Sequence, residues 1–130
     1  MIEVYIDGAS AGDPGPSGAG IFIRGHGKGE QFSIPLGQLS NHEAEYMALL
    51  HALEICLSKK YTTVSFRTDS QLIERAIENR HAKNEKYLPL LKRALELIDR
   101  FDLFFIKWIP GSQNNTADLL AKKAVRLNGD

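Results

Sequence analysis

Apolar and polar side chains alternate at the start of the chain. From residue 2 to residue 6 every second position is apolar, which predicts a strand that ends at Asp7. Residues 8–20 (G-A-S-A-G-D-P-G-P-S-G-A-G) are rich in glycine and proline and predict a turn region. Short apolar runs at 19–24 and 31–36 are separated by G-H-G-K-G, a pattern typical of a hairpin. This part of the chain is therefore predicted to form a three-stranded antiparallel meander.

A helix is predicted next, over residues 41–58, where Ser40 and Glu43 form the S-x-x-E capping box that marks a helix start. Further elements are predicted in the order strand, helix, helix, strand, helix, at residues 63–68, 70–79, 85–100, 104–109 and 114–127. The order βββαβααβα predicts an α/β fold, a five-stranded mixed sheet flanked by helices. In such sheets, sites gather beyond the carboxyl ends of strands, where Asp7 and Asp69 lie. The nearly continuous apolar run F-F-I-K-W-I predicts that Trp108 is part of the core.

Composition narrows the class of protein. A length of 130 residues with 43% hydrophobic and 25% charged side chains predicts one globular domain over residues 1–130. No signal peptide or membrane-spanning run is evident, and the lone Cys56, predicted to be buried, cannot form an intrachain disulfide, so we expect a protein of the reducing cytoplasm. A net charge of zero argues against strong non-specific binding of nucleic acid. It does not exclude a nucleic-acid enzyme whose bound metal ions supply the positive charge.

Four carboxylates stand out in this background: Asp7, Glu45, Asp69 and Asp118. Three of them lie where the apolar pattern predicts burial or the mouth of a core. Like charges near a core repel one another and lose hydration unless a cation joins them. If the fold brings the four together, the natural counter-ion is a hard divalent cation such as Mg²⁺, and the site fits metal-dependent phosphoryl transfer.

Each acid also has an ordinary alternative role. Asp7 could be a turn residue, Asp69 an N-cap, and Asp118 a partner of its helix dipole. Glu45 could be a first-turn acid, but it shares a helix face with three apolar residues, at positions 48, 49 and 52, and is the hardest to explain without a partner. Ser70 could cap the second helix instead of Asp69, which would leave Asp69 free for chemistry.

Four motifs in order make a recognisable set: Y-I-D-G-A-S with G-D-P-G-P-S-G-A-G, then S-N-H-E-A-E-Y-M-A-L, F-R-T-D-S-Q, and W-I-P-G-S-Q-N-N-T-A-D-L-L-A. Over essentially its whole length the chain resembles the type 1 ribonuclease H family, within the retroviral-integrase-like superfamily. The resemblance implies an RNase H-like fold and endonucleolytic cleavage of the RNA strand of RNA–DNA hybrids. It further implies two Mg²⁺ or Mn²⁺ ions among the four acids, with Asp7 bridging them.

The resemblance also implies a set of hybrid-binding positions: Gly8, Asp13, Ser40, Asn41, His42, Gln71 and Asn114. Side-chain amides can both donate to and accept from a 2′-OH, the group that distinguishes RNA from DNA. Ser40 takes the place of a phosphate-contacting Thr at a helix start, where anions are favoured. Plain helix capping is the alternative role for Ser40 and Asn41.

Three departures from the family pattern qualify this expectation. Asp13 replaces the usual Asn of a G-N-P-G-P turn and would repel phosphate, or could point away as a turn residue. The loop at 110–114 lacks the mobile His of many bacterial members. Their basic, Trp-rich protrusion is reduced to residues 81–93, whose lysines and arginine could equally form a solvated helix face.

We therefore expect a monomeric, metal-dependent hybrid ribonuclease with no membrane association and no obligate protein partner. The first alternative is a weakly active or inactive relative that binds hybrid or structured RNA. The second is a nuclease of the same superfamily that acts on DNA junctions or another duplex, which Asn41 and Gln71 disfavour.

Overall fold

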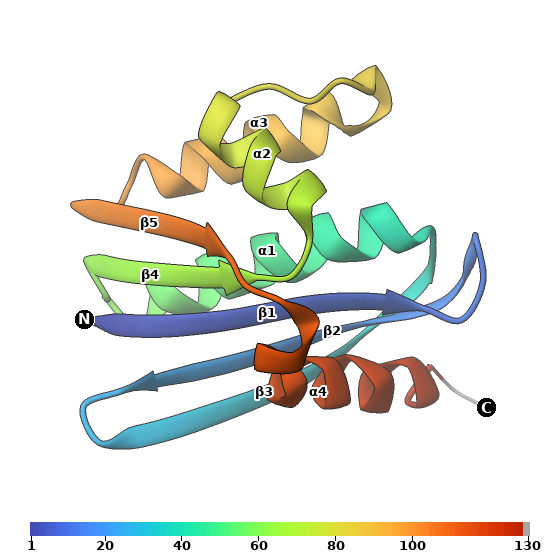
Figure 1. Cartoon of the computed structure of the whole chain (residues 1–130), viewed down its shortest axis with the longest axis horizontal. Coiled ribbons are helices and arrows are strands. Elements are labelled where there is room, and N and C mark those ends of the chain that lie inside the picture. Colours follow the sequence, from blue (N-terminus) through green and yellow to red (C-terminus); the bar gives the residue numbers. More distant parts are fainter. Residues whose placement is uncertain (129–130) are drawn as a thin grey trace.

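The computed structural model describes residues 1–128 and shows a five-stranded mixed sheet with helices on both faces (Figure 1). The strands are β1 (Ile2–Ser10), β2 (Gly15–Gly25), β3 (Lys28–Leu39), β4 (Thr63–Thr68) and β5 (Leu103–Trp108). The helices are α1 (Asn41–Ser58), α2 (Gln71–Asn79), α3 (Leu88–Ile98) and α4 (Asn115–Arg126). The strand order is β3-β2-β1-β4-β5, with the β1–β2 and β2–β3 pairs antiparallel and the β1–β4 and β4–β5 pairs parallel. The predicted α/β architecture and element order are confirmed.

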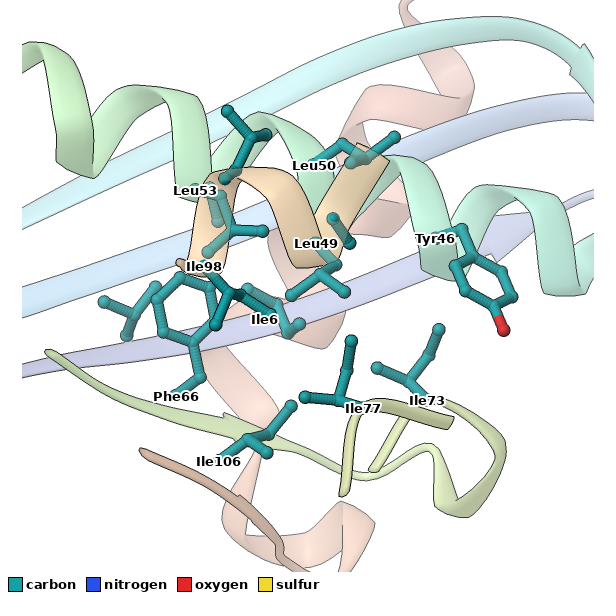
Figure 2. Close-up of a cluster of buried hydrophobic side chains, with 14 of the residues drawn as sticks. Ile6, Tyr46, Leu49, Leu50, Leu53, Phe66, Ile73, Ile77, Ile98 and Ile106 are labelled. Carbon is teal, nitrogen blue, oxygen red and sulfur yellow. The ribbon is translucent and has the colours of Figure 1, made fainter. Parts of the chain in front are cut away.

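The core lies between the sheet and helices α1, α2 and α3. Alternate residues of β1 point into it, and Ile6 packs there with Leu49 and Leu53 of α1 and with Phe66 of β4 (Figure 2). Tyr46 lies at one end of this cluster and is fully buried. Helix α4 is on the opposite face of the sheet, against β2, β1 and β3. One face of the sheet is thus covered by α1, α2 and α3, which bury most of the apolar residues, and the other face is covered in part by α4.

The glycine-rich segment is mostly strand rather than turn, so the turn predicted for residues 8–20 is wrong. Strand β1 continues to Ser10 and β2 begins at Gly15, leaving a connection of residues 11–14. The glycines serve close packing instead: a Cβ at Gly8 would collide with the backbone of Ala44 in α1, and one at Gly20 with the backbone of α4. Glycine therefore lets two helices approach β1 and β2 beside Asp7.

Helix boundaries follow local capping chemistry. Helix α1 has the predicted bounds, and the capping box is formed in both directions: the Glu43 amide donates to Ser40 Oγ (3.2 Å) and the Ser40 amide to Glu43 Oε1 (3.0 Å). The predicted helix over 85–100 begins instead with a 3₁₀ turn at Glu85–Tyr87, and α3 starts at Leu88. Pro89 occupies the first turn of α3, where its missing N–H leaves no bond unmade.

Trp108 is not a core residue, which corrects the prediction from its apolar run. Its residue surface is 43% exposed, because it ends β5, the edge strand of the sheet. The indole Nε1 donates to the backbone carbonyl of Asp69 at 3.1 Å. Cys56 is buried as predicted, and burial raises the pKa of its thiol to about 12. None of the helices within residues 1–128 combines the length and apolar character needed to cross a membrane.

Candidate active site

Two of the predicted acids meet through strand register. Strands β1 and β4 are parallel, and Ile6 is paired with Thr68. Asp7 and Asp69 are the next residues along the sequence. The Asp7 side chain points to the sheet face opposite α1, because the Ile6 side chain before it in β1 points into the core. The carboxyl groups of Asp7 and Asp69 lie within hydrogen-bonding reach of each other. The alternative of a turn residue does not hold for Asp7, which lies within a strand.

Helix α4 supplies the third acid. Asp118 lies in its first turn, and its carboxyl group comes within hydrogen-bonding reach of that of Asp7. Gly18 and Gly20 make this possible, because a Cβ at either position would overlap the α4 backbone. Asp118 also forms an ion pair with Lys122 Nζ at 3.0 Å, one turn further along α4.

Helix α1 supplies the fourth acid. Glu45 lies in its first turns, directly above Gly8, and the side chain is 16% exposed. Its Oε2 accepts a hydrogen bond from Ser70 Oγ at 2.9 Å and lies 3.4 Å from His42 Nδ1. Glu45 therefore lies at the mouth of the core, and Ser70 and His42 hold its carboxylate in position.

Electrostatics show how closely these acids interact. Burial and the neighbouring carboxyl groups of Asp69, Asp118 and Glu45 raise the pKa of Asp7 to about 8. Burial also raises the pKa of Glu45 and of Asp69. All the charged neighbours that shift the Asp7 pKa are acids, so the cluster lacks an internal counter-charge at Asp7.

The donor set fits a hard divalent cation. Carboxylate oxygens are the ligands that Mg²⁺ and Mn²⁺ prefer, and a cation would relieve the repulsion around Asp7. Within residues 1–128, however, no group of three or more Asp, Glu, His or Cys side chains is arranged as a complete set of metal ligands. The Asp7 carboxyl group nevertheless lies close to those of Asp69 and Asp118. Glu45 is meanwhile held by Ser70 and His42.

Ser70 has two roles at the site: it caps α2, as the sequence allows, and it binds Glu45, which the sequence does not indicate. It is the N-cap of α2, with Oγ accepting from the Ile73 amide at 3.2 Å, so Asp69 is not the cap. Its own amide donates to Thr68 Oγ1 at 3.0 Å, and its hydroxyl donates to Glu45. The link between Ser70 and Glu45 joins α2 to α1 and could not be found from either motif alone.

The predicted hybrid-binding residues fall into three groups. Asn41 and His42 are exposed at the start of α1, and Gln71 is exposed at the start of α2, next to Ser70. Asp13 is exposed in the connection between β1 and β2, while Gly8 and Ser40 are occupied by packing and by the capping box. The third group is Asn114 alone. It is 1% exposed, and its Nδ2 donates to the Ile6 carbonyl at 2.9 Å, so it faces the protein interior.

Comparison with known proteins places this arrangement in a family. Residues 5–124 match the family described as reverse transcriptase-like. The chain is 41% identical over 128 residues to the putative hydrolase EbsB of Enterococcus faecalis, covering 97% of this chain and 95% of EbsB. It is 35% identical over 127 residues to ribonuclease HI of Halobacterium salinarum, covering 95% of this chain and 64% of that protein.

Solved structures agree with these sequence relatives. The crystal structure of RNase H1 from Halobacterium salinarum superposes with a TM-score of 0.90 at 34% identity, covering 96% of this chain and 97% of the other. LC11-RNase H1, solved in complex with an RNA/DNA hybrid, superposes with a TM-score of 0.88 at 29% identity, covering 98% of both chains. The fold, the ordered motifs and these relatives together show that the chain belongs to the type 1 ribonuclease H family.

Proposed function

We propose that this protein is a metal-dependent endoribonuclease that cleaves the RNA strand of RNA–DNA hybrids. The observation that carries the proposal is the gathering of three other acids around Asp7, from α1, the end of β4 and α4. Relatives named ribonuclease H and a similar structure bound to a hybrid support the same substrate. All four acids come from one chain, so the proposed site needs no second subunit.

The residues that would hold two Mg²⁺ or Mn²⁺ ions are Asp7, Glu45, Asp69 and Asp118. Such ions, when bound, lower the pKa of a water to make a nucleophile and stabilise the leaving 3′ oxygen. Asp7 would release its proton as the ions bind, because a nearby cation favours the carboxylate. Ser70 fixes Glu45, and Trp108 fixes the backbone at Asp69. These contacts keep carboxylates from different elements in place while their charges change.

The starts of α1 and α2 would read the RNA strand. The exposed amides of Asn41 and Gln71 can both donate to and accept from a 2′-OH. Ser40 Oγ is committed to the α1 cap, so a phosphate there would be bound through the electropositive helix start rather than through that hydroxyl alone. Asn114 is buried, and we assign it a positioning role in place of the substrate contact that the family resemblance implied.

A second candidate function is binding of hybrid or structured RNA with little or no cleavage. Three features favour it. Asp118 is paired with Lys122, and Asp13 places a negative charge in the turn between β1 and β2. The loop at 110–114 also lacks a His that could assist product release. These features would weaken turnover or substrate binding without removing the acids themselves.

Cleavage of a hybrid labelled on its RNA strand, with Mg²⁺ and with Mn²⁺, separates the two functions. The wild-type chain should cut the RNA strand with at least one of the metals, and Asp69→Asn, which removes one ligand charge at similar size, should lose most of the activity. Hybrid binding without cleavage under both metals would favour the binding function. Equal cleavage of a DNA duplex would contradict hybrid specificity.

A further inference from the structure

The sheet face opposite α1 is covered by α4 at only one end. Beyond α4, seven side chains from four strands lie on this face, and none of the helices within residues 1–128 covers them; we call them the open sheet face: Glu3, Tyr5, Phe22, Arg24, Arg67, Phe105 and Lys107. Figure 1 shows α4 near β2 and β3, away from β5 and β4. Phe105 is 48% exposed and Arg24 has 57% of its side chain exposed. Within residues 1–128, this part of the sheet face is thus not covered by a helix.

Strand register makes this face continuous with the acid cluster. Tyr5 is paired with Phe22 on β2 and with Arg67 on β4, which is in turn paired with Lys107 on β5. The next position on this face along β1 is Asp7. A polymer that lies on the open sheet face would therefore continue to the proposed catalytic acids, starting at Asp7.

The charge of the face is positive although the chain as a whole is neutral. Outside the acid cluster, strands β1, β2, β4 and β5 contribute one carboxylate to it, Glu3, which is shared by Arg24 Nε (3.4 Å) and Arg67 Nη1 (3.3 Å). Lys107 takes part in no ion pair within residues 1–128. The excess of cations favours an anionic occupant and disfavours a second copy of this face, which would bring like charges together.

Aromatic rings are interleaved with these cations. The Tyr5 and Phe22 ring centroids are 5.9 Å apart, and the Arg67 guanidinium lies 5.5 Å from the centre of the Tyr5 ring. Two hollows of about 490 and 160 Å³ share Phe22 and Arg24 in their walls. The smaller one is also lined by residues 112–117 and so lies between the face and the start of α4. Aromatic platforms beside cations are how proteins hold unpaired bases and their phosphates.

We propose that the open sheet face binds single-stranded nucleic acid, the unpaired continuation of a strand whose duplex part is held at the acid cluster. The position of the duplex rests on the proposed function, whereas binding of an unpaired strand to the face does not. Bases would stack on the exposed rings, with Phe105 the most accessible, and phosphates would pair with Arg24 and Lys107.

The test compares binding, in EDTA to prevent cleavage, of a blunt hybrid, the same hybrid with a 5′ or a 3′ single-stranded tail on either strand, and a single-stranded oligonucleotide alone. At least one tail should tighten binding by about fivefold or more, which is the effect of stacking a single base. The double variant Phe105→Ala/Lys107→Ala should lose most of this gain. The matched variant Leu119→Ala/Lys123→Ala, on exposed positions of α4, should keep it.

Several results would overturn the inference. One is that no tail adds affinity to the wild-type chain, and another is that the Phe105→Ala/Lys107→Ala variant keeps the gain. Polyglutamate that competes as well as the oligonucleotide would assign the face to an acidic protein instead. A dimer that Phe105→Ala dissociates, seen by light scattering, would assign it to a second copy. If the blunt hybrid fails to bind but the single-stranded oligonucleotide binds through Phe105 and Lys107, the inference stands and the proposed function falls.

Discussion

The side-chain amide of Asn114 donates a 2.9 Å hydrogen bond to the backbone carbonyl of Ile6, the residue before Asp7. Asn114 is 1% exposed, and its side chain also acts to lower the pKa of the Asp69 carboxyl group. One buried amide therefore ties the start of α4 to β1, directly before Asp7, and influences the acid that follows β4. Its Oδ1 has no partner within residues 1–128.

This contact predicts that Asn114→Ala impairs catalysis more than it impairs the fold. Removing the amide leaves the Ile6 carbonyl unpaired and should lower the free energy of unfolding by about 2 kcal/mol. Misplaced acids should lower kcat for hybrid cleavage by about tenfold or more while KM changes little. Steady-state kinetics and chemical denaturation measure the two effects.

Ser33→Ala is the matched control for Asn114→Ala. Ser33 Oγ donates to the Leu120 carbonyl at 2.8 Å and so also ties α4 to the sheet, away from the acids. Its loss should cost about 1 kcal/mol of stability and leave kcat nearly unchanged. If both variants reduced kcat equally, the role of Asn114 would be general support of α4.

The raised pKa of Asp7 predicts a pH-dependent stability. The folded protein keeps a proton on Asp7 up to about pH 8, whereas the unfolded chain loses it near the ordinary value of 3.8. Because the folded state binds more protons between these values, stability in EDTA should fall as pH rises from about 4 to 8. Asp7→Asn stays neutral, so at pH 8 its Tm should exceed that of the wild type, with little difference near pH 4.

Divalent metal should reduce this pH dependence. Mg²⁺ or Mn²⁺ stabilises the ionised carboxylates and raises the wild-type Tm most at high pH, but should do little for Asp7→Asn. Thermal scans over the same pH series, with and without metal, test both statements. Parallel pH profiles for the wild type and Asp7→Asn in EDTA would show that Asp7 is not the buried, proton-retaining acid of the cluster.

Replacing Asp13 should increase the affinity for an RNA–DNA hybrid. It is exposed in the β1–β2 connection, where the family resemblance places the nucleic-acid backbone. Asp13→Asn should tighten hybrid binding about threefold at low salt, and less at high salt as the charge is screened. Asp102→Asn, exposed directly before the edge strand β5, serves as the control for net charge. An equal gain in both variants would remove Asp13 from the interface.

The buried hydroxyl of Tyr46, the residue after the proposed metal ligand Glu45, suggests a substitution that should stabilise the protein. Its ring stacks on Tyr87 with centroids 5.5 Å apart, and its buried hydroxyl has no hydrogen-bond partner within residues 1–128. Tyr46→Phe should therefore raise the free energy of unfolding by about 1 kcal/mol and keep hybrid cleavage, whereas Tyr87→Phe should bring no gain. A loss of stability in Tyr46→Phe would reveal a partner for the hydroxyl.

Features set by short-range chemistry could be predicted from the sequence. The Ser40–Glu43 capping box predicts the start of α1 correctly, and the apolar stripe beside Glu45 indicates an acid at the mouth of the core. The order of strands and helices followed from apolar periodicity. These signals depend on residues a few positions apart, so they can be identified without knowledge of the tertiary structure.

Features set by contacts between distant segments could not be predicted. The composition of residues 8–20 predicts a turn for Gly8 and Gly20, because sequence does not distinguish a turn from the close approach of a helix. The apolar run around Trp108 predicts a core position, because such a run does not show whether its strand lies at the sheet edge. The contacts from Ser70 to Glu45 and from Asn114 to Ile6 join residues 25 and 108 positions apart.

We propose that Asp7, Glu45, Asp69 and Asp118 together hold the metal ions. Anomalous diffraction from a crystal soaked in Mn²⁺ is the most direct test of this site. Two Mn²⁺ peaks should appear at the acid cluster, within reach of these four carboxylates. Peaks only elsewhere on the protein, or no peak at Asp7 in saturating Mn²⁺, would contradict the proposed metal centre.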